Sequence, residues 1–146
     1  MMNKFITTIL LLSTLSVHAD STSTLTLPYA STLDGDTIRS YITLPEPLNK
    51  ISIRINGIDT PESTWRAKCP QERVNGILAK AYLTDYLKDT RVLYVRDFKY
   101  GKYAGRILGT VYVRKDDVLV SLAEVMTIAG FAQPYNGKKK PDWCNF

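Results

Sequence analysis

The chain has 146 residues, 45% of them hydrophobic, and a formal net charge of +5. This length is typical of a single domain, and the modest positive charge favours polyanionic partners without identifying one. The one histidine, His18, lies close to the N-terminus. The sequence beyond it therefore excludes mechanisms that need an imidazole base or ligand, including Ser-His-Asp triads and histidine-rich zinc sites.

The first residues predict an export signal. Lys4 precedes an apolar run from Phe5 to Val17, and Ala19 offers a small residue at the expected cleavage position. The run is shorter than the roughly 20 residues of a membrane-spanning helix. We expect a signal peptide over residues 1–19 and one mature domain over 20–146, exported to the periplasm or secreted, with no membrane span. An uncleaved anchor is the alternative.

Three strands are predicted next. The segments enriched in β-branched residues are Leu25 to Leu33, Thr37 to Leu44 and Ile51 to Ile58. In the third segment the isoleucines alternate with polar residues, which directs Arg54 away from the apolar face. Asp34, Gly35 and Asp36 have the composition of a turn between the first two strands.

The rest of the chain predicts two helices and two more strands. Val74, Ile77, Leu78, Tyr82 and Leu87 recur near helical spacing, so a helix is expected from Gln71 to Leu87. Strands at 91–96 and 106–113 flank a polar segment, 97–105. A short helix from Leu119 to Ile128 should end at Gly130, before an irregular tail. This order predicts a mainly β (α+β) fold, a five-stranded OB-fold barrel with two packed helices.

Cys69 and Cys144 are the only cysteines of the chain. Two cysteines cannot build a tetrahedral zinc site, and an oxidising compartment favours a disulfide between them. The alternative is two unpaired thiols.

Two short runs carry the chemistry. They are Leu33-Asp34-Gly35-Asp36-Thr37 and Arg54-Ile55-Asn56-Gly57-Ile58-Asp59-Thr60-Pro61-Glu62. Carboxylates suit a hard cation, an arginine suits a phosphoryl group, and a further carboxylate can accept a proton from water. Tyr103-Ala104-Gly105-Arg106 supplies a second arginine. Together these residues predict a metal site that hydrolyses phosphodiesters.

These motifs, in this order, resemble the staphylococcal nuclease (thermonuclease) family. The resemblance extends from about Leu25 to Tyr135. It implies a five-stranded OB barrel and an endonuclease that cleaves DNA and RNA with little sugar specificity. Such an enzyme uses Ca²⁺, with Mg²⁺ or Mn²⁺ as alternatives, and breaks the bond between phosphorus and the 5′ oxygen. The competing hypothesis is a catalytically inactive OB module that binds nucleic acid or protein; in either case we expect a monomer.

The resemblance also implies roles for individual residues. Asp36 and Asp59 would bind the metal through their carboxylates, and Thr60 through its backbone carbonyl. Arg54 and Arg106 would hold the scissile phosphate, and Glu62 would orient or deprotonate the attacking water. Lys102, Tyr103 and Tyr135 would contact the nucleic acid, although tyrosines in barrels commonly serve only in packing.

Four features leave an alternative open. Ala104 adds a residue between Tyr103 and Arg106 relative to the family pattern, which either turns Arg106 to the other face or is absorbed in the loop. Asp34 is expected to cap the turn. The run Lys138-Lys139-Lys140 either tracks a nucleic-acid backbone or forms a solvated tail. Trp65 and Lys68 lie in the loop after Glu62, where ordinary packing is the simpler interpretation.

Overall fold

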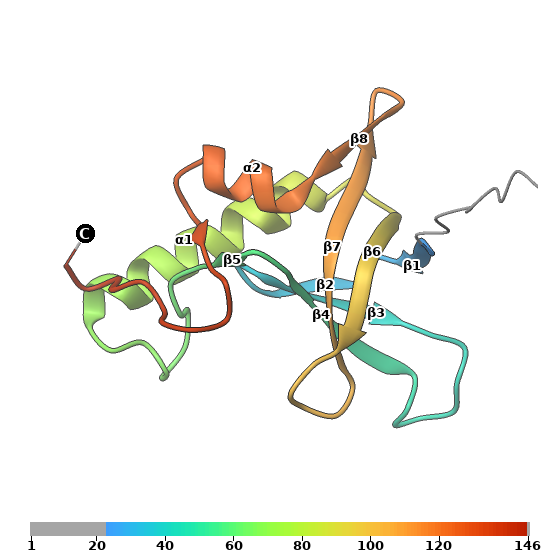
Figure 1. Ribbon diagram of the computed structural model, residues 1–146, viewed down its shortest axis with the longest axis horizontal. Coiled ribbons are helices and arrows are strands. Elements are labelled where there is room, and N and C mark those ends of the chain that lie inside the picture. The colour runs from blue at the N-terminus through green and yellow to red at the C-terminus, as the bar shows by residue number, and fades with distance from the viewer. Residues whose placement is uncertain (1–22, 146) are drawn as a thin grey trace, which may run out of the picture.

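The computed structural model describes residues 23–145 of the chain, and the predicted signal peptide lies outside them. In Figure 1 the helices lie on one side of the molecule and the long strands β6 and β7 on the other. The elements are, in chain order, β1 (Leu25–Pro28), β2 (Ser31–Asp34), β3 (Thr37–Tyr41), β4 (Lys50–Ile55), β5 (Ile58–Asp59), α1 (Pro70–Leu87), β6 (Val92–Tyr100), β7 (Arg106–Lys115), β8 (Val118–Ser121), α2 (Leu122–Ile128) and β9 (Gln133–Pro134).

The main sheet has the strand order β1-β6-β7-β4-β3-β2, with β8 paired to β7. Its pairs are antiparallel apart from β4 and β7, which run parallel, and β5 pairs separately with β9. The predicted mixed α+β class, mostly strands with two helices, holds for residues 23–145. The sheet does not close into a ring of hydrogen-bonded strands, so the predicted five-stranded barrel is not confirmed.

The predicted first strand is interrupted at Tyr29 and Ala30. The amide of Tyr29 donates to the carbonyl of Arg91, whereas the amide of Ala30 donates to Arg39 on β3. The chain therefore changes its pairing partner from β6 to β3 between β1 and β2. The change comes directly after Pro28, which has no amide hydrogen to donate to a neighbouring strand.

Two further boundaries differ from the prediction. The second helix begins at Leu122, because Val118–Ser121 extends the sheet by pairing with β7 and Ser121 caps the helix. Strand β6 continues to Tyr100 through an irregularity at Asp97, whose φ of 49° bends the chain. The predicted polar loop 97–105 is therefore shorter than expected.

The core lies between the main sheet and the two helices. Ile53 and Ile55 of β4 are buried while Arg54 between them faces the other way, as the alternation predicts. The other buried apolar residues are Leu27, Ile38, Ile58, Ala79, Leu83, Leu87, Leu93, Val95, Val111, Val113, Leu122, Met126 and Ala132. This packing fixes the polar face of β4 relative to the loops at its end.

Helix α1 begins within one residue of its predicted start and ends at the predicted Leu87. Of the apolar residues that predict it, Leu87 is buried, whereas Val74, Ile77 and Leu78 are about half exposed. Gly76 and Ala79 are buried instead. A Cβ atom built on Gly76 would lie 2.4 Å from the carbonyl carbon of Glu62, so small residues here let the helix approach the loop backbone.

A Gly76→Ala substitution tests this close approach. Replacing glycine by alanine inside a helix normally stabilises by about 1 kcal/mol. Here the methyl group would overlap the Glu62 backbone, and we expect a net destabilisation of about 1–3 kcal/mol in urea unfolding. Thr84→Ala, on the exposed face of the same helix, is the control. Equal or higher stability of Gly76→Ala would contradict the packing argument.

Candidate active site

A cleft of about 730 Å³ opens where the β2–β3 turn, β4, the loop after β5 and the β6–β7 turn meet. The segment after β9 completes its wall. The cleft contains most of the residues that the sequence motifs single out. It is lined by Leu33, Asp34, Asp36, Thr37, Arg54, Glu62, Thr64, Trp65, Arg66, Tyr100, Lys102, Tyr103, Arg106, Leu108, Tyr135, Gly137 and Lys140.

Arg54 joins two buried carboxylates at the floor of the cleft. Its Nη1 lies 2.7 Å from Oδ2 of Asp36, and its Nη2 lies 3.0 Å from Oδ1 of Asp59. The hydroxyl of Thr37 donates to the other oxygen of Asp36 at 2.8 Å. The motif residues Asp36, Arg54 and Asp59 are thus brought together, as the sequence predicts.

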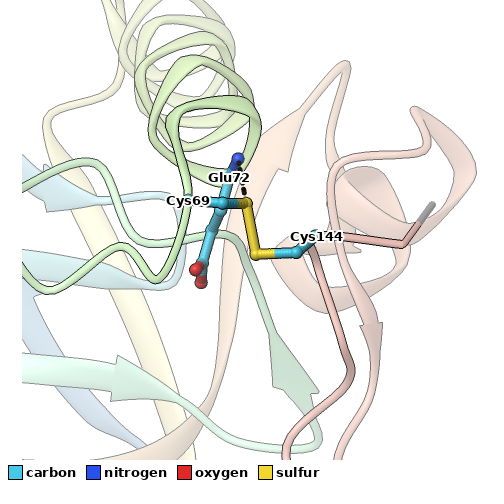
Figure 2. Close-up of side chains that lie close together, drawn as sticks. All are labelled: Cys69, Glu72 and Cys144. Carbon is cyan, nitrogen blue, oxygen red and sulfur yellow. Dashed lines mark hydrogen bonds between the residues drawn. A yellow bond between two sulfur atoms is a disulfide. The ribbon is translucent and has the colours of Figure 1, made fainter.

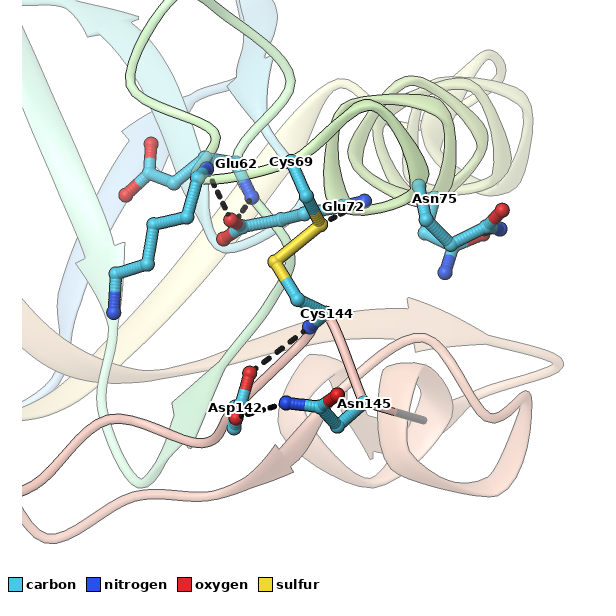
Figure 3. Close-up of a disulfide and its surroundings, with 9 residues drawn as sticks. Glu62, Cys69, Glu72, Asn75, Asp142, Cys144 and Asn145 are labelled. Atoms are coloured by element: carbon cyan, nitrogen blue, oxygen red, sulfur yellow. Dashed lines mark hydrogen bonds between the residues drawn. A yellow bond between two sulfur atoms is a disulfide. The ribbon is translucent and has the colours of Figure 1, made fainter.

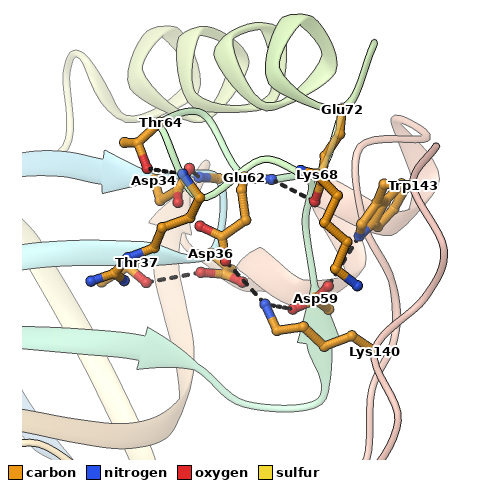
Figure 4. Close-up of polar contacts among 12 residues, drawn as sticks. Asp34, Asp36, Thr37, Asp59, Glu62, Thr64, Lys68, Glu72, Lys140 and Trp143 are labelled. Carbon is orange, nitrogen blue, oxygen red and sulfur yellow. Dashed lines mark hydrogen bonds and ion pairs between the residues drawn. The ribbon is translucent and has the colours of Figure 1, made fainter. Parts of the chain in front are cut away.

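Asp59 also receives two contacts from the C-terminal tail, the segment 137–145 after β9. Nζ of Lys140 lies 3.0 Å from Oδ1 of Asp59 and 3.1 Å from Oε1 of Glu62. The indole Nε1 of Trp143 donates to Oδ2 of Asp59 at 3.0 Å. Figure 4 shows both tail side chains pointing toward Asp59. Sequence reasoning missed these two contacts.

Burial shapes the electrostatics of the cluster. It raises the pKa of Asp36, against the opposing effects of the Arg54 guanidinium and the Thr37 hydroxyl. Burial also raises the pKa of Asp34. For Lys140 burial lowers the pKa, but Asp59 and Glu62 outweigh that effect and the net shift is upward. The ammonium therefore stays charged between two carboxylates.

Asp36, Asp59 and Glu62 are the residues of this cluster that could hold a hard cation. Asp36, Asp59 and Glu62 carry one more charge than the arginine and lysine that pair with them. A buried carboxylate whose negative charge is not fully balanced is stabilised by a bound cation. Carboxylate oxygens are also the ligands that Ca²⁺ prefers. Thr60 is buried directly beneath the turn before Asp36, since a Cβ on Gly35 would lie 2.8 Å from its Oγ1. It follows Asp59 directly in the chain, and the role of its carbonyl as a ligand stays a prediction.

A second cluster, of two cysteines and a carboxylate, is not a metal site. Among residues 23–145, Cys69, Glu72 and Cys144 converge closely, but the two sulfur atoms are bonded to each other (Figure 2). The predicted disulfide is therefore confirmed, and the alternative of two free thiols is wrong. Its Cα atoms are 6.0 Å apart, and it ties the tail to the start of α1.

Glu72 holds the loop that carries Glu62. Its buried carboxylate accepts from the amide of Lys68 at 2.6 Å and, weakly, from that of Glu62 at 3.4 Å. Cys69 caps α1 by accepting from the amide of Glu72 (Figure 3). The helix N-terminus and the disulfide thus fix the loop, and Glu62 projects into the cleft.

Arg106 begins β7 and lines the same cleft as Arg54. The extra residue is absorbed in the turn, where Gly105 has a φ of +70° and the amide of Arg106 donates to the carbonyl of Tyr103. Arg106 pairs with Ser52 in the β4–β7 ladder, which places it on the same face as Arg54. Its guanidinium lies 5.2 Å from the centre of the Tyr103 ring.

The other predicted contact residues also lie at the cleft. Lys102 and Tyr103 form one rim, and 58% of Tyr103 is exposed. Tyr135 lies on the opposite wall and is half-buried. Of the lysine run only Lys140 lines the cleft, where it pairs with Asp59 and Glu62, while Lys138 and Lys139 are exposed. Tracking of a nucleic-acid backbone by this run stays a prediction. Trp65, expected to pack in a loop, is 84% exposed at the rim.

The family model of staphylococcal nuclease homologues matches residues 52–143. The chain belongs to this family. The match includes Arg54, Asp59, Glu62 and Arg106, whereas Asp36 lies before it. No protein of curated function matches the chain significantly. Among the described residues, no helix is long and apolar enough to cross a membrane.

An Arg54→Met substitution tests the charge cluster. It leaves Asp36 and Asp59 without their shared partner, and we expect a loss of about 3 kcal/mol in unfolding free energy without metal. Ca²⁺ should raise the melting temperature of the variant more than that of the wild type, because the site has lost a positive charge. Arg114→Ala, an exposed arginine, is the control. A loss of stability that Ca²⁺ leaves untouched would argue against a cation at this cluster.

Reduction of the disulfide should destabilise the protein. The bridge closes a loop of 75 residues, which on the chain-entropy model contributes about 4 kcal/mol. Thermal melts with and without a thiol reductant measure the effect, and intact mass after alkylation of the non-reduced protein should show no added alkyl group. Unchanged melting on full reduction would mean that packing alone holds the tail.

Proposed function

We propose that this chain is an exported, Ca²⁺-dependent endonuclease that hydrolyses phosphodiester bonds of DNA and RNA with little sugar specificity. The observation that carries the proposal is that Asp36, Arg54 and Glu62 line one cleft, with Arg106 on the same face of the sheet. Asp59 is buried behind them and pairs with Arg54. Family membership supports it. We include in the proposal a cleavable signal peptide over residues 1–19, a periplasmic or secreted location, and a monomer.

In the proposed reaction Asp36, Asp59 and the Thr60 carbonyl hold the cation, with Mg²⁺ or Mn²⁺ as substitutes. A bound cation would supply positive charge to the phosphoryl oxygens. With their charge compensated, Asp36 and Asp59 no longer need Arg54, whose guanidinium can then donate to the phosphate. Arg106 donates from the same face, so two arginines share the charge that develops on the phosphoryl oxygens.

Glu62 is the proposed base, since no histidine occurs after His18. A water oxygen bonds to phosphorus, Glu62 accepts the proton of that water, and the bond from phosphorus to the 5′ oxygen breaks. The leaving 5′ oxygen takes a proton from solvent. Glu62 has to release Lys140 to act in this way, because their ion pair occupies one carboxylate oxygen. Lys102, Tyr103 and Tyr135 would position the nucleic acid along the cleft.

We also interpret the sheet as a five-stranded OB barrel. If β1 and β2 are two halves of one bent strand, the strand order forms a ring with β3, β4, β7 and β6. The hydrogen bonds of Tyr29 to Arg91 and of Ala30 to Arg39 support this interpretation, because they continue the two ladders across the break. Helix α1 then lies between the third and fourth strands of that barrel in chain order.

The second candidate is an inactive module that binds nucleic acid. It is favoured by the ion pairs in the cleft, since Arg54 is engaged with two carboxylates and Glu62 with Lys140. The exposed rings of Trp65 and Tyr103 at the rim would serve either function.

A cleavage assay separates the two candidates. Mature protein is incubated with plasmid DNA and with single-stranded RNA, in Ca²⁺ and in a chelator. We expect cleavage of both substrates only with the metal, and Glu62→Gln should lower turnover at least ~10²-fold while nucleic-acid binding persists. Thr64→Ala, in the same wall of the cleft, is the matched control. Binding without cleavage in Ca²⁺, Mg²⁺ and Mn²⁺ would favour the inactive module.

A further inference from the structure

The two carboxylate oxygens of Asp59 have different partners. Oδ1 faces the cationic groups of Arg54 and Lys140, each at 3.0 Å. Oδ2 accepts a hydrogen bond from Trp143, also at 3.0 Å. Both Lys140 and Trp143 belong to the C-terminal tail, so one short segment acts on both oxygens of a single carboxylate.

We propose that the C-terminal tail sets the metal affinity of the site, with two opposing effects. Lys140 is a tethered cation that a metal has to displace from Asp59 and Glu62. Trp143 is a positioning residue that fixes the Asp59 carboxylate so that Oδ1 faces the cleft. This inference rests on the metal site of the proposed function and adds a determinant of its affinity.

The case for Lys140 is its position between two carboxylates. Its ammonium lies 3.0 Å from Asp59 and 3.1 Å from Glu62, and 41% of the side chain remains exposed. Two cations cannot share these oxygens without strong repulsion at such distances. A metal at Asp59 therefore has to move the lysine, and because the side chain is long and partly exposed it can swing into solvent. The neighbouring Lys138 and Lys139 are exposed and form no ion pair within residues 23–145.

The case for Trp143 is a buried and directional hydrogen bond. The indole N–H is a donor only, and the residue is 7% exposed, so water offers little replacement for this partner. Partners that hold a metal-ligating group from behind commonly change metal affinity 10–100-fold when removed. With Oδ2 held, rotation of the carboxylate would break the bond to the indole, so Oδ1 keeps its direction.

The tail keeps its position through its own contacts. Cys144 is bonded to Cys69 at the N-cap of α1, and Asp142 accepts from the amide of Cys144 at 3.1 Å and from Nδ2 of Asn145 at 2.7 Å (Figure 3). Lys140 and Trp143 therefore approach Asp59 from a fixed anchor. The sulfur bridge places them next to the cleft without contributing a ligand.

The first experiment titrates Ca²⁺ into the oxidised full-length mature protein by calorimetry. Lys140→Met keeps the length of the side chain and removes its charge, and we expect its Kd for Ca²⁺ to fall at least about tenfold. Lys139→Met loses the same charge one position away and should stay within about threefold of the wild type. Lys140→Arg should restore the weaker wild-type affinity. Equal affinities for Lys140→Met and Lys139→Met would overturn the role of Lys140.

The second experiment uses Trp143→Phe, which keeps an aromatic ring and removes the donor. Its Kd for Ca²⁺ should rise 10–100-fold, opposite in sign to Lys140→Met. A melt in chelator shows whether the variant folds; if it does not, nuclear magnetic resonance of the wild-type indole N–H decides, and we expect its chemical shift to respond to Ca²⁺. A folded variant of unchanged affinity, or an indole signal indifferent to the metal, would overturn the role of Trp143.

These outcomes are separable from those of the proposed function. Ca²⁺ binding that Asp36→Ala abolishes establishes the site, and unchanged affinities in the tail variants then overturn only the present inference. No Ca²⁺ binding by either wild type or Lys140→Met defeats the metal site and the inference together. Metal binding with the expected tail effects but no cleavage leaves the inference standing and defeats the endonuclease.

Discussion

The fork that Arg54 makes between Asp36 and Asp59 is the interaction on which the arrangement of the site depends. Two carboxylates are buried within reach of one another, and without a cation between them their repulsion and desolvation would oppose folding. The guanidinium offsets both effects, because each of its two terminal nitrogens pairs with one of the carboxylates. In the proposed function, the same charges that require Arg54 in the absence of metal would accept a cation, so folding and ligand binding would depend on one electrostatic arrangement.

Close packing around small residues turns this arrangement into a cleft. Gly76 lets α1 reach the backbone of Glu62, and Gly35 lets the β2–β3 turn lie against Thr60. Glu72 then holds the intervening loop through backbone amides, although it is a charged residue in a buried position. Helix α1 begins directly after Cys69, which caps it and is bonded to Cys144 of the tail. The start of this helix therefore positions both Glu62, the proposed base, and the tail that contacts it. The floor of the site is therefore packed against the core, whereas long side chains such as Lys102 and Arg66 form its exposed rim.

The sequence was sufficient to predict the elements and residues whose signal is local. Alternation in β4 predicts that Arg54 faces away from the core. For the insertion before Arg106 the sequence leaves two outcomes open, and the turn at Gly105 absorbs it. The spacing of Ile77 and Leu78 predicts the helix but not the close approach at Gly76, because apolar periodicity gives no weight to a residue without a side chain. The contacts of Lys140 and Trp143 with Asp59 join residues far apart in the sequence, and no local pattern predicts such contacts. The cysteine beside Trp143 was the one available signal, since a bridge to Cys69 brings the tail to the loop after Glu62.

The distribution of charge in the cleft would let one surface attract the proposed polyanionic substrate and also hold the proposed cation. The centre is acidic, because Asp36, Asp59 and Glu62 outnumber the cations that pair with them. The rim is basic, since Arg66, Lys102 and Arg106 line the same opening and the last two lie against the ring of Tyr103. A phosphate chain would be drawn to the rim first, while the centre repels it until a cation neutralises the local charge. Lys140 supplies part of that neutralisation from within the protein, so the field that a nucleic acid would meet depends on which cation, lysine or metal, occupies the carboxylates.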